Sequence, residues 1–124
     1  MGTWGPKNLD SDYALDELHS RSAELIASLL GRARSKTSRQ CDEYDYTTLF
    51  VEFEIVFAPA DHGLLNCELP PPTDVVELAD NYIRDWAVQI NELGASESHK
   101  RERRQVIEST FRRFRVLCEE RQAR

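Results

Sequence analysis

The sequence predicts an all-α fold, a small four-helix bundle with an N-terminal arm over residues 1–10. Four segments carry apolar residues at three- and four-residue steps, which is the spacing of one face of a helix. Residues that typically begin or end helices lie next to these segments. A length of 124 residues suits one domain and is enough for a hydrophobic core without disulfides. We therefore predict a single helical domain over residues 1–124.

The first helix is expected over residues 11–30. Asp10 or Ser11 can accept hydrogen bonds from the free N–H groups of its first turn. The apolar face then repeats in helical steps through Leu15, Leu18, Ser22, Leu25, Ile26 and Leu29. Gly31 is expected to end the helix, since glycine often follows the last helical residue. Residues 31–43 are expected to form a polar loop. Its basic residues are interpreted as solvated, because no aromatic side chain lies among them to stack on a base.

Residues 44–58 fit two kinds of secondary structure. Apolar residues alternate with glutamates as in a strand, at Leu49, Val51, Phe53, Ile55 and Phe57. A helical face is equally visible, made by Tyr46, Leu49, Phe50, Phe53, Val56 and Phe57. The β-branched and aromatic content favours a strand, whereas the length and the lack of a second strand favour a helix. We predict a helix that ends before Pro59 and keep the strand as the alternative.

The last two helices are expected over residues 73–93 and 96–122. Thr73 and Asp74 are placed to cap the first of them, and Glu77 could complete a capping box with Asp74. Gly94 is expected to end it, and Ser96 to begin the last helix. Both segments carry one apolar face and one charged face, the pattern of helices in a bundle.

Charge is segregated along the chain although the net charge is only −6. Residues 40–98 contain thirteen acids and one arginine, and residues 99–124 contain nine basic residues and four acids. Such asymmetry concerns partners and steering rather than the fold. We predict a partner-binding acidic surface made by Asp42, Glu43, Asp45, Asp61, Glu77, Asp80 and Asp85. Nucleic acid is not expected as a partner, because the chain as a whole is acidic with a pI of about 5.1.

The sequence contains no known nucleophile, nucleotide-binding or zinc motif. Three acids near the N-terminus, Asp10, Asp12 and Asp16, lack the spacing of a calcium-binding loop. Helix capping is the simpler role for Asp10 and Asp12. An acid–base pair of His62 with Glu52 or Glu54 is the catalytic alternative. We therefore predict no catalytic residue, no metal and no cofactor.

The cysteine content indicates a reducing compartment, so the predicted location is cytoplasmic. Cys41, Cys67 and Cys118 are odd in number and widely spaced, which argues against a disulfide framework. No apolar run approaches the roughly 18 residues of a membrane span, so no membrane partner is expected. Trp4 and Gly5 are expected to pack the N-terminal arm across the bundle.

The first eighteen residues resemble a bacterial family of uncharacterised small proteins. Members open with Met-Gly-x-Trp-Gly and continue with Phe-[Asp/Glu]-Asn-Asp-x-Ala-x-Asp-[Phe/Trp]-[Leu/Ile], and this chain has Met1 to Gly5 followed by Leu9 to Leu18. It departs from the pattern where Leu9 replaces Phe, Ser11 replaces Asn and Glu17 replaces an aromatic residue. The resemblance implies a helical fold and a bacterial source, and it implies no activity.

These observations favour a non-catalytic protein-binding domain. Small acidic bacterial domains without catalytic residues often inhibit toxins, so an immunity-type or antitoxin-like inhibitor is one hypothesis, by analogy. Its partner would be a basic toxin domain facing the acidic middle of the chain. The alternative is a small metal-dependent or hydrolytic enzyme of unknown substrate.

Overall fold

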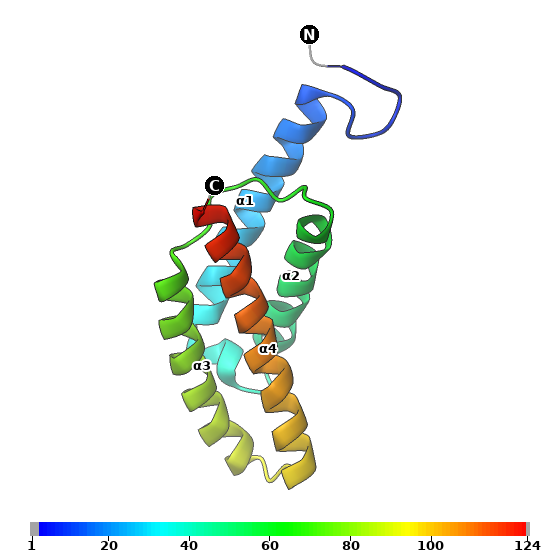
Figure 1. Cartoon of the computed structure of the whole chain (residues 1–124). Helices are drawn as coiled ribbons and strands as arrows, with labels where there is room; N and C mark the ends of the chain where they lie inside the picture. The colour runs from blue at the N-terminus through cyan, green and yellow to red at the C-terminus, as the bar shows by residue number, and fades with distance from the viewer. Residues whose placement is uncertain (1–2, 124) are drawn as a thin grey trace.

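The computed structural model describes residues 3–123, and this part of the chain contains four α-helices and one short 3₁₀ helix. The elements are α1 (Asp12–Arg34), η1 (Lys36–Arg39), α2 (Tyr44–Asp61), α3 (Pro72–Glu92) and α4 (Glu97–Gln122). Successive α-helices run in opposite directions along one bundle (Figure 1). The predicted all-α four-helix bundle is confirmed, and residues 44–58 are helical rather than a strand.

The helices pack as a ring in which each contacts two others. α3 and α4 share the most extensive contact of any pair of helices, whereas the contact between α2 and α4 is small. α1 contacts α2 and α3, so α1 lies diagonally opposite α4. The segment between α2 and α3 crosses one end of the bundle, and η1 lies near the other end (Figure 1). Within the described residues, no helix has the length and apolar character that crossing a membrane requires.

Aromatic side chains from α2, α3 and α4 form the centre of the core. The ring of Phe53 lies 5.2 Å from that of Phe111 and 5.5 Å from that of Phe114, both at edge-to-face angles. Tyr82 of α3 packs on Phe111 at 5.3 Å. These rings are buried, and edge-to-face pairs add to the free energy gained from burial. They hold α2 by its inner face.

The N-terminal arm folds against the start of α1, so the prediction that it packs across the bundle is wrong. The Trp4 side chain is 58% exposed, and its backbone N–H donates to the Asp10 carbonyl at 3.0 Å. A Cβ on Gly5 would lie 2.3 Å from the Asp10 carboxylate, so a larger residue there would require the Asp10 side chain to move. Asp10 thus stabilises the arm, and the Ser11 hydroxyl caps α1 by accepting from the Ala14 N–H.

Two predicted helix ends are also wrong. α1 does not end at Gly31 but continues to Arg34, because the extra turn buries Ala33 completely and places Arg32 against α2. The polar segment expected over 31–43 therefore begins as helix and includes η1. α3 begins at Pro72 without the predicted side-chain caps of Thr73 and Asp74. A proline at the first helical position needs no cap for its own nitrogen, since it has no N–H.

One further helix end is as predicted and another is not. The Ser96 hydroxyl accepts from the His99 N–H at 3.2 Å and begins α4 as expected. The prediction that α2 ends before Pro59 is wrong, because the helix continues to Asp61 and includes Pro59 in its last turn. Proline has no N–H, so the carbonyl of Ile55, four residues earlier, lacks its usual helical hydrogen bond.

Candidate functional site

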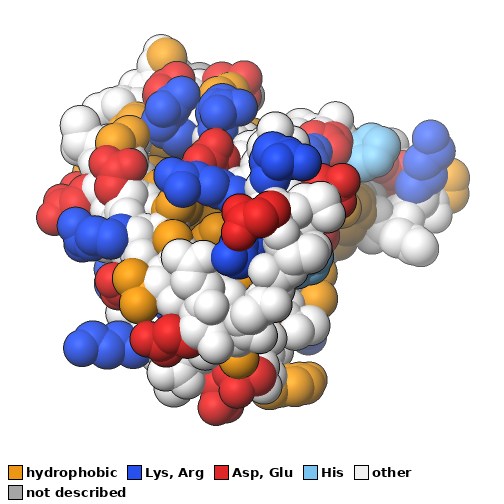
Figure 2. All heavy atoms as spheres, turned by 90° about the horizontal axis from the view of Figure 1, so that it is seen from below, with side chains coloured by type: hydrophobic (Ala, Val, Ile, Leu, Met, Phe, Trp, Pro, Cys, Tyr) orange, Lys and Arg blue, Asp and Glu red, His pale blue; other side chains and the backbone are white. Residues whose placement is uncertain are grey.

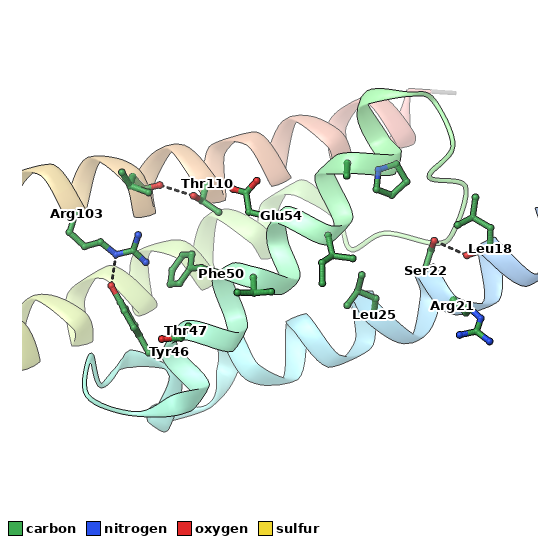
Figure 3. Close-up of a pocket in the computed structure, with 15 residues that line it drawn as sticks. Leu18, Arg21, Ser22, Leu25, Tyr46, Thr47, Phe50, Glu54, Arg103 and Thr110 are labelled. Atoms are coloured by element: carbon green, nitrogen blue, oxygen red, sulfur yellow. Dashed lines mark hydrogen bonds between the residues drawn. The ribbon is translucent and has the colours of Figure 1, made fainter.

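A groove of about 930 Å³ follows the outer face of α2, and we call it the α2 groove. α2 runs along its middle, with α1 on one side and α4 on the other (Figure 3). Its lining is mainly apolar and includes Leu18, Leu25, Phe50, Val51, Ile55 and Val106. The brief contact between α2 and α4 leaves this side of the bundle open.

The groove exists because α2 carries apolar side chains on both of its faces. Its inner residues, such as Phe53 and Val56, are completely buried. On the outer face Val51 is 50% exposed and Ile55, one turn later, is 51% exposed. A helix that is apolar all round is normally covered on all sides, and contiguous exposed apolar surface often marks an interaction site.

Two charged side chains at the groove have no ionic partner among residues 3–123. Arg103 of α4 lies over the ring of Phe50 at 4.5 Å and that of Tyr46 at 5.1 Å, and its Nε donates to the Tyr46 hydroxyl (Figure 3). No carboxylate of the described chain lies within 4.0 Å of its guanidinium. Glu54 is exposed on α2 and forms neither an ion pair nor a hydrogen bond within the same part of the chain. Burial raises the pKa of the Tyr46 phenol, so this hydroxyl stays protonated beside Arg103 at neutral pH.

Three of the seven predicted partner-binding acids are paired within the molecule. Asp45 contacts Arg32 at 2.5 Å, Asp85 contacts Arg39 at 2.5 Å, and Asp61 contacts Arg113 at 2.6 Å. The other four are exposed without an ion-pair partner in the described residues: Asp42, Glu43, Glu77 and Asp80. Acidic and basic side chains are interspersed over the face seen in Figure 2. The charge segregation of the sequence therefore does not become a single acidic face in this view.

A partly buried ion pair joins α1 to α2, and sequence reasoning missed it. Glu52 is only 8% exposed, and its carboxylate lies 2.8 Å from Nε of Arg32. Arg32 also reaches Asp45, two turns earlier on the same face of α2. The sequence assigned Arg32 to a solvated loop and Glu52 to a candidate acid–base pair. Only the length of α1 brings the two together, and no sequence spacing signals a pair between helices.

The alternative catalytic pair is not assembled. His62 is exposed at the C-terminal end of α2 and forms no side-chain hydrogen bond with the rest of residues 3–123. Glu52 is engaged by Arg32, and Glu54 lies at the α2 groove. Asp10 accepts from the Lys7 N–H in the arm. Across the described chain, no three His, Cys, Asp or Glu side chains are grouped to hold a metal ion.

All three cysteines are free thiols, as predicted. Burial raises the pKa of Cys118 to about 12 and also raises the pKa of Cys67. For Cys41 burial again raises the pKa. A thiol with a raised pKa is a poor nucleophile, because the thiolate is the reactive form.

The arginines of α4 are partly neutralised by neighbouring acids. Arg104 pairs with Glu108 at 2.8 Å, and Arg115 pairs with Glu119 at 3.2 Å, each one turn along the helix. Arg113 reaches across to Asp61 and lies over the ring of Phe57 at 4.2 Å. The first two pairs lie along the surface of α4, and the contacts of Arg113 join α4 to α2. That nucleic acid is not a partner stays a prediction.

Within the stretch that resembles a bacterial family, residues 3–18 form the arm and the first turns of α1. Asp10 and Ser11 have structural roles there, as a partner of the arm and as a helix cap. Among these described residues, only Leu18 lines the α2 groove. The chain matches no protein-family model, no curated protein and no solved structure, so the resemblance stays a prediction.

Proposed function

We propose that this chain is a non-catalytic protein-binding domain and that its binding surface is the α2 groove. The observation that carries the proposal is the half-exposed apolar pair Val51 and Ile55 at the centre of the groove. Covering such side chains gains free energy of about 25 cal/mol for each Å² of apolar surface removed from water. The predicted protein partner is retained, but the proposed contact surface moves from the acids to the groove.

The rest of the bundle offers no comparable surface among the described residues. Other large exposed apolar side chains lie singly on charged helices, such as Val88 on α3 and Val116 on α4. Scattered exposed apolar residues of this kind are normal for a folded protein. At the groove, by contrast, three helices contribute apolar residues to one continuous lining.

Arg103 and Glu54 would supply specificity at the edges of the contact. Interfaces commonly combine an apolar centre with polar groups around it, and complementary charges fix the orientation of the partner. Arg103 is already held by Tyr46 and Phe50, so little side-chain freedom remains to be lost on binding.

The test is a matched pair of valine substitutions in the tagged chain. Val51→Asp places a charge at the centre of the groove, and Val88→Asp places the same charge on α3, where the valine is 59% exposed. We expect any protein captured by the wild type, a second copy included, to be lost with Val51→Asp and kept with Val88→Asp. Equal capture by both variants, with both folded, would exclude the groove.

An immunity-type inhibitor of a basic toxin domain is a second candidate, favoured by one observation. Asp42, Glu43, Glu77 and Asp80 remain exposed and free of ion pairs in the described chain. Reversing all four to Lys should slow association at low ionic strength, and wild type and variant should converge at high salt. A groove contact should instead persist in high salt, which separates the two candidates.

A further inference from the structure

We infer that the occupant of the α2 groove is a second copy of this chain, with the two α2 helices packed antiparallel about Val51 and Glu54 of each copy paired with Arg103 of the other. The inference rests on the proposed function, because it names the partner of the same surface. It is carried by two complementary charges that the isolated chain leaves unpaired at one apolar face.

The two charges flank the apolar strip on its α4 side. Arg103 extends from α4 over Tyr46 and Phe50, in the first half of α2. Glu54 projects from the second half of α2 toward α4 (Figure 3). Within residues 3–123 neither side chain has a partner of opposite charge. One chain therefore presents a cation and an anion at two different levels along the same surface.

The helical rise places these charges in register for a two-fold axis. Glu54 lies three residues beyond Val51, which is about 4.5 Å along the helix axis. An antiparallel copy centred on Val51 would bring its Glu54 to the level of residue 48, between Tyr46 and Phe50. That is the level at which Arg103 lies over the two rings.

The symmetry makes the contact self-complementary. An axis through Val51, lying in the interface and perpendicular to α2, keeps the α4 sides of both copies together. The Glu54–Arg103 pair then forms twice, the two Val51 side chains cover each other, and Ile55 of each copy lies at the level of Thr47 of the other. Two-fold dimers in which one patch meets itself are the commonest protein oligomers. A foreign protein would have to supply this charge pattern, whereas a second copy already has it.

Sedimentation equilibrium over micromolar to millimolar protein concentration tests the inference by charge exchange. We expect the wild type to dimerise, and Glu54→Arg or Arg103→Glu alone to weaken association at least tenfold by opposing like charges. The double variant should recover association to within about threefold of the wild type. Glu77→Arg on α3 and Arg101→Glu on α4 are matched controls, both exposed and away from the groove, and they should leave association unchanged.

A cross-link tests the axis without altering Arg103, whose contacts with Tyr46 and Phe50 also support the fold. Val51→Cys, with the three native cysteines replaced by serine or alanine, should form an intermolecular disulfide on mild oxidation, and Val88→Cys should not. A wild type that stays monomeric to millimolar concentration would overturn the second-copy inference. Loss of a foreign protein on Val51→Asp in that same monomer would still support the groove as a binding surface. Dimerisation without recovery in the double variant, or without a Val51→Cys cross-link, would overturn the antiparallel register.

Discussion

The outer faces of α2 and α4 differ in their content of charged residues. α4 has thirteen charged residues among 26, and most of them face solvent or pair along the helix. α2 has four charged residues among 18, and Glu52 is buried while Asp45 and Asp61 pair with arginines of other helices. Glu54 is therefore the one charged residue of α2 without an ion-pair partner in the described chain. α4 thus has the composition of a helix with one solvent-exposed face, whereas α2 has the composition of a helix that is covered on both faces.

The difference shows that a helix face can be apolar in composition and still be exposed to solvent. The inner face of α2 is as well packed as that of α4, since Phe53 and Phe114 contact each other and both are fully buried. Its outer face has the same apolar character with no neighbour. The stability of the bundle and its binding surface therefore depend on opposite faces of one helix, and substitutions can separate them.

The largest expected effect separates those two faces of α2. Phe53→Ala should lower the free energy of unfolding by about 3–5 kcal/mol, because it leaves a cavity among Phe57, Phe111 and Phe114. Val51→Ala, two residues away, should change it by less than about 0.5 kcal/mol. Urea denaturation of both variants measures the contrast. Similar losses at the two positions would mean that the outer face is also part of the packed core.

The second prediction concerns pH and the dry interior beside α4. Cys118 is buried, and its pKa is raised from 9.0 to about 12 in the folded chain. The folded state therefore keeps the thiol protonated where the unfolded chain loses its proton. The contribution of this thiol to the free energy of unfolding is fully present below pH 9. It falls as the pH rises from 9 to 12, by up to about 4 kcal/mol at the end of that range. Cys118→Ala should flatten this slope relative to the wild type.

A control for the pH measurement comes from thiol accessibility. At pH 8 a disulfide reagent should modify the partly exposed Cys41 first, and Cys67 and Cys118 only after denaturation. Fast modification of Cys118 in the native protein would contradict a dry environment, and with it the explanation of the slope.

The third prediction compares charges inside and outside the bundle. Glu52→Gln should cost about 1–3 kcal/mol, because Arg32 would lose its buried partner and keep only Asp45. Glu108→Gln removes the partner of Arg104 on the exposed face of α4 and should cost less than about 1 kcal/mol. Chemical denaturation in low and high salt measures both variants. Salt should weaken the surface pair more, and the opposite order would place Arg32 and Glu52 in solvent.

The smallest expected effect concerns how the helices begin. Ser96→Ala should cost about 1 kcal/mol, because the N–H of His99 loses its acceptor. Thr73→Ala should be nearly neutral, since α3 begins with proline and uses no side-chain cap. Thermal unfolding of the two variants is sufficient to compare them. A larger loss at Thr73 would support the capping role that the sequence suggested and that the structure does not contain.

The sequence predicted the bundle well because three of its helices have clear apolar faces and recognisable ends. The ambiguity between helix and strand for residues 44–58 had a physical cause. The alternation of Val51 and Ile55 with inner residues resembles a strand because both faces of α2 are apolar. That ambiguity was itself the available signal for the groove. Arg103 and the Arg32–Glu52 pair could not be foreseen, since they depend on where separate helices lie in space.

Other errors arose where tertiary contacts outweighed local preference. Gly31 is a weak helix former, but the burial of Ala33 carries α1 past it. The seven acids looked like one group in sequence, yet three of them face arginines that the fold brings close. The run of acids in the sequence therefore did not show which of its members would pair within the molecule.

Pro59 leaves the C-terminal end of α2 with one backbone hydrogen bond fewer. The carbonyl of Ile55 lacks a helical donor, so the last turn is held by fewer backbone hydrogen bonds than the turns before it. Segments with fewer such bonds open locally at lower free energy than the core of the same helix. Amide hydrogens after Pro59 should therefore exchange with solvent sooner than those near Phe53. A partner that donates a hydrogen bond to the Ile55 carbonyl would slow this exchange, and the end of α2 would report on occupancy of the groove.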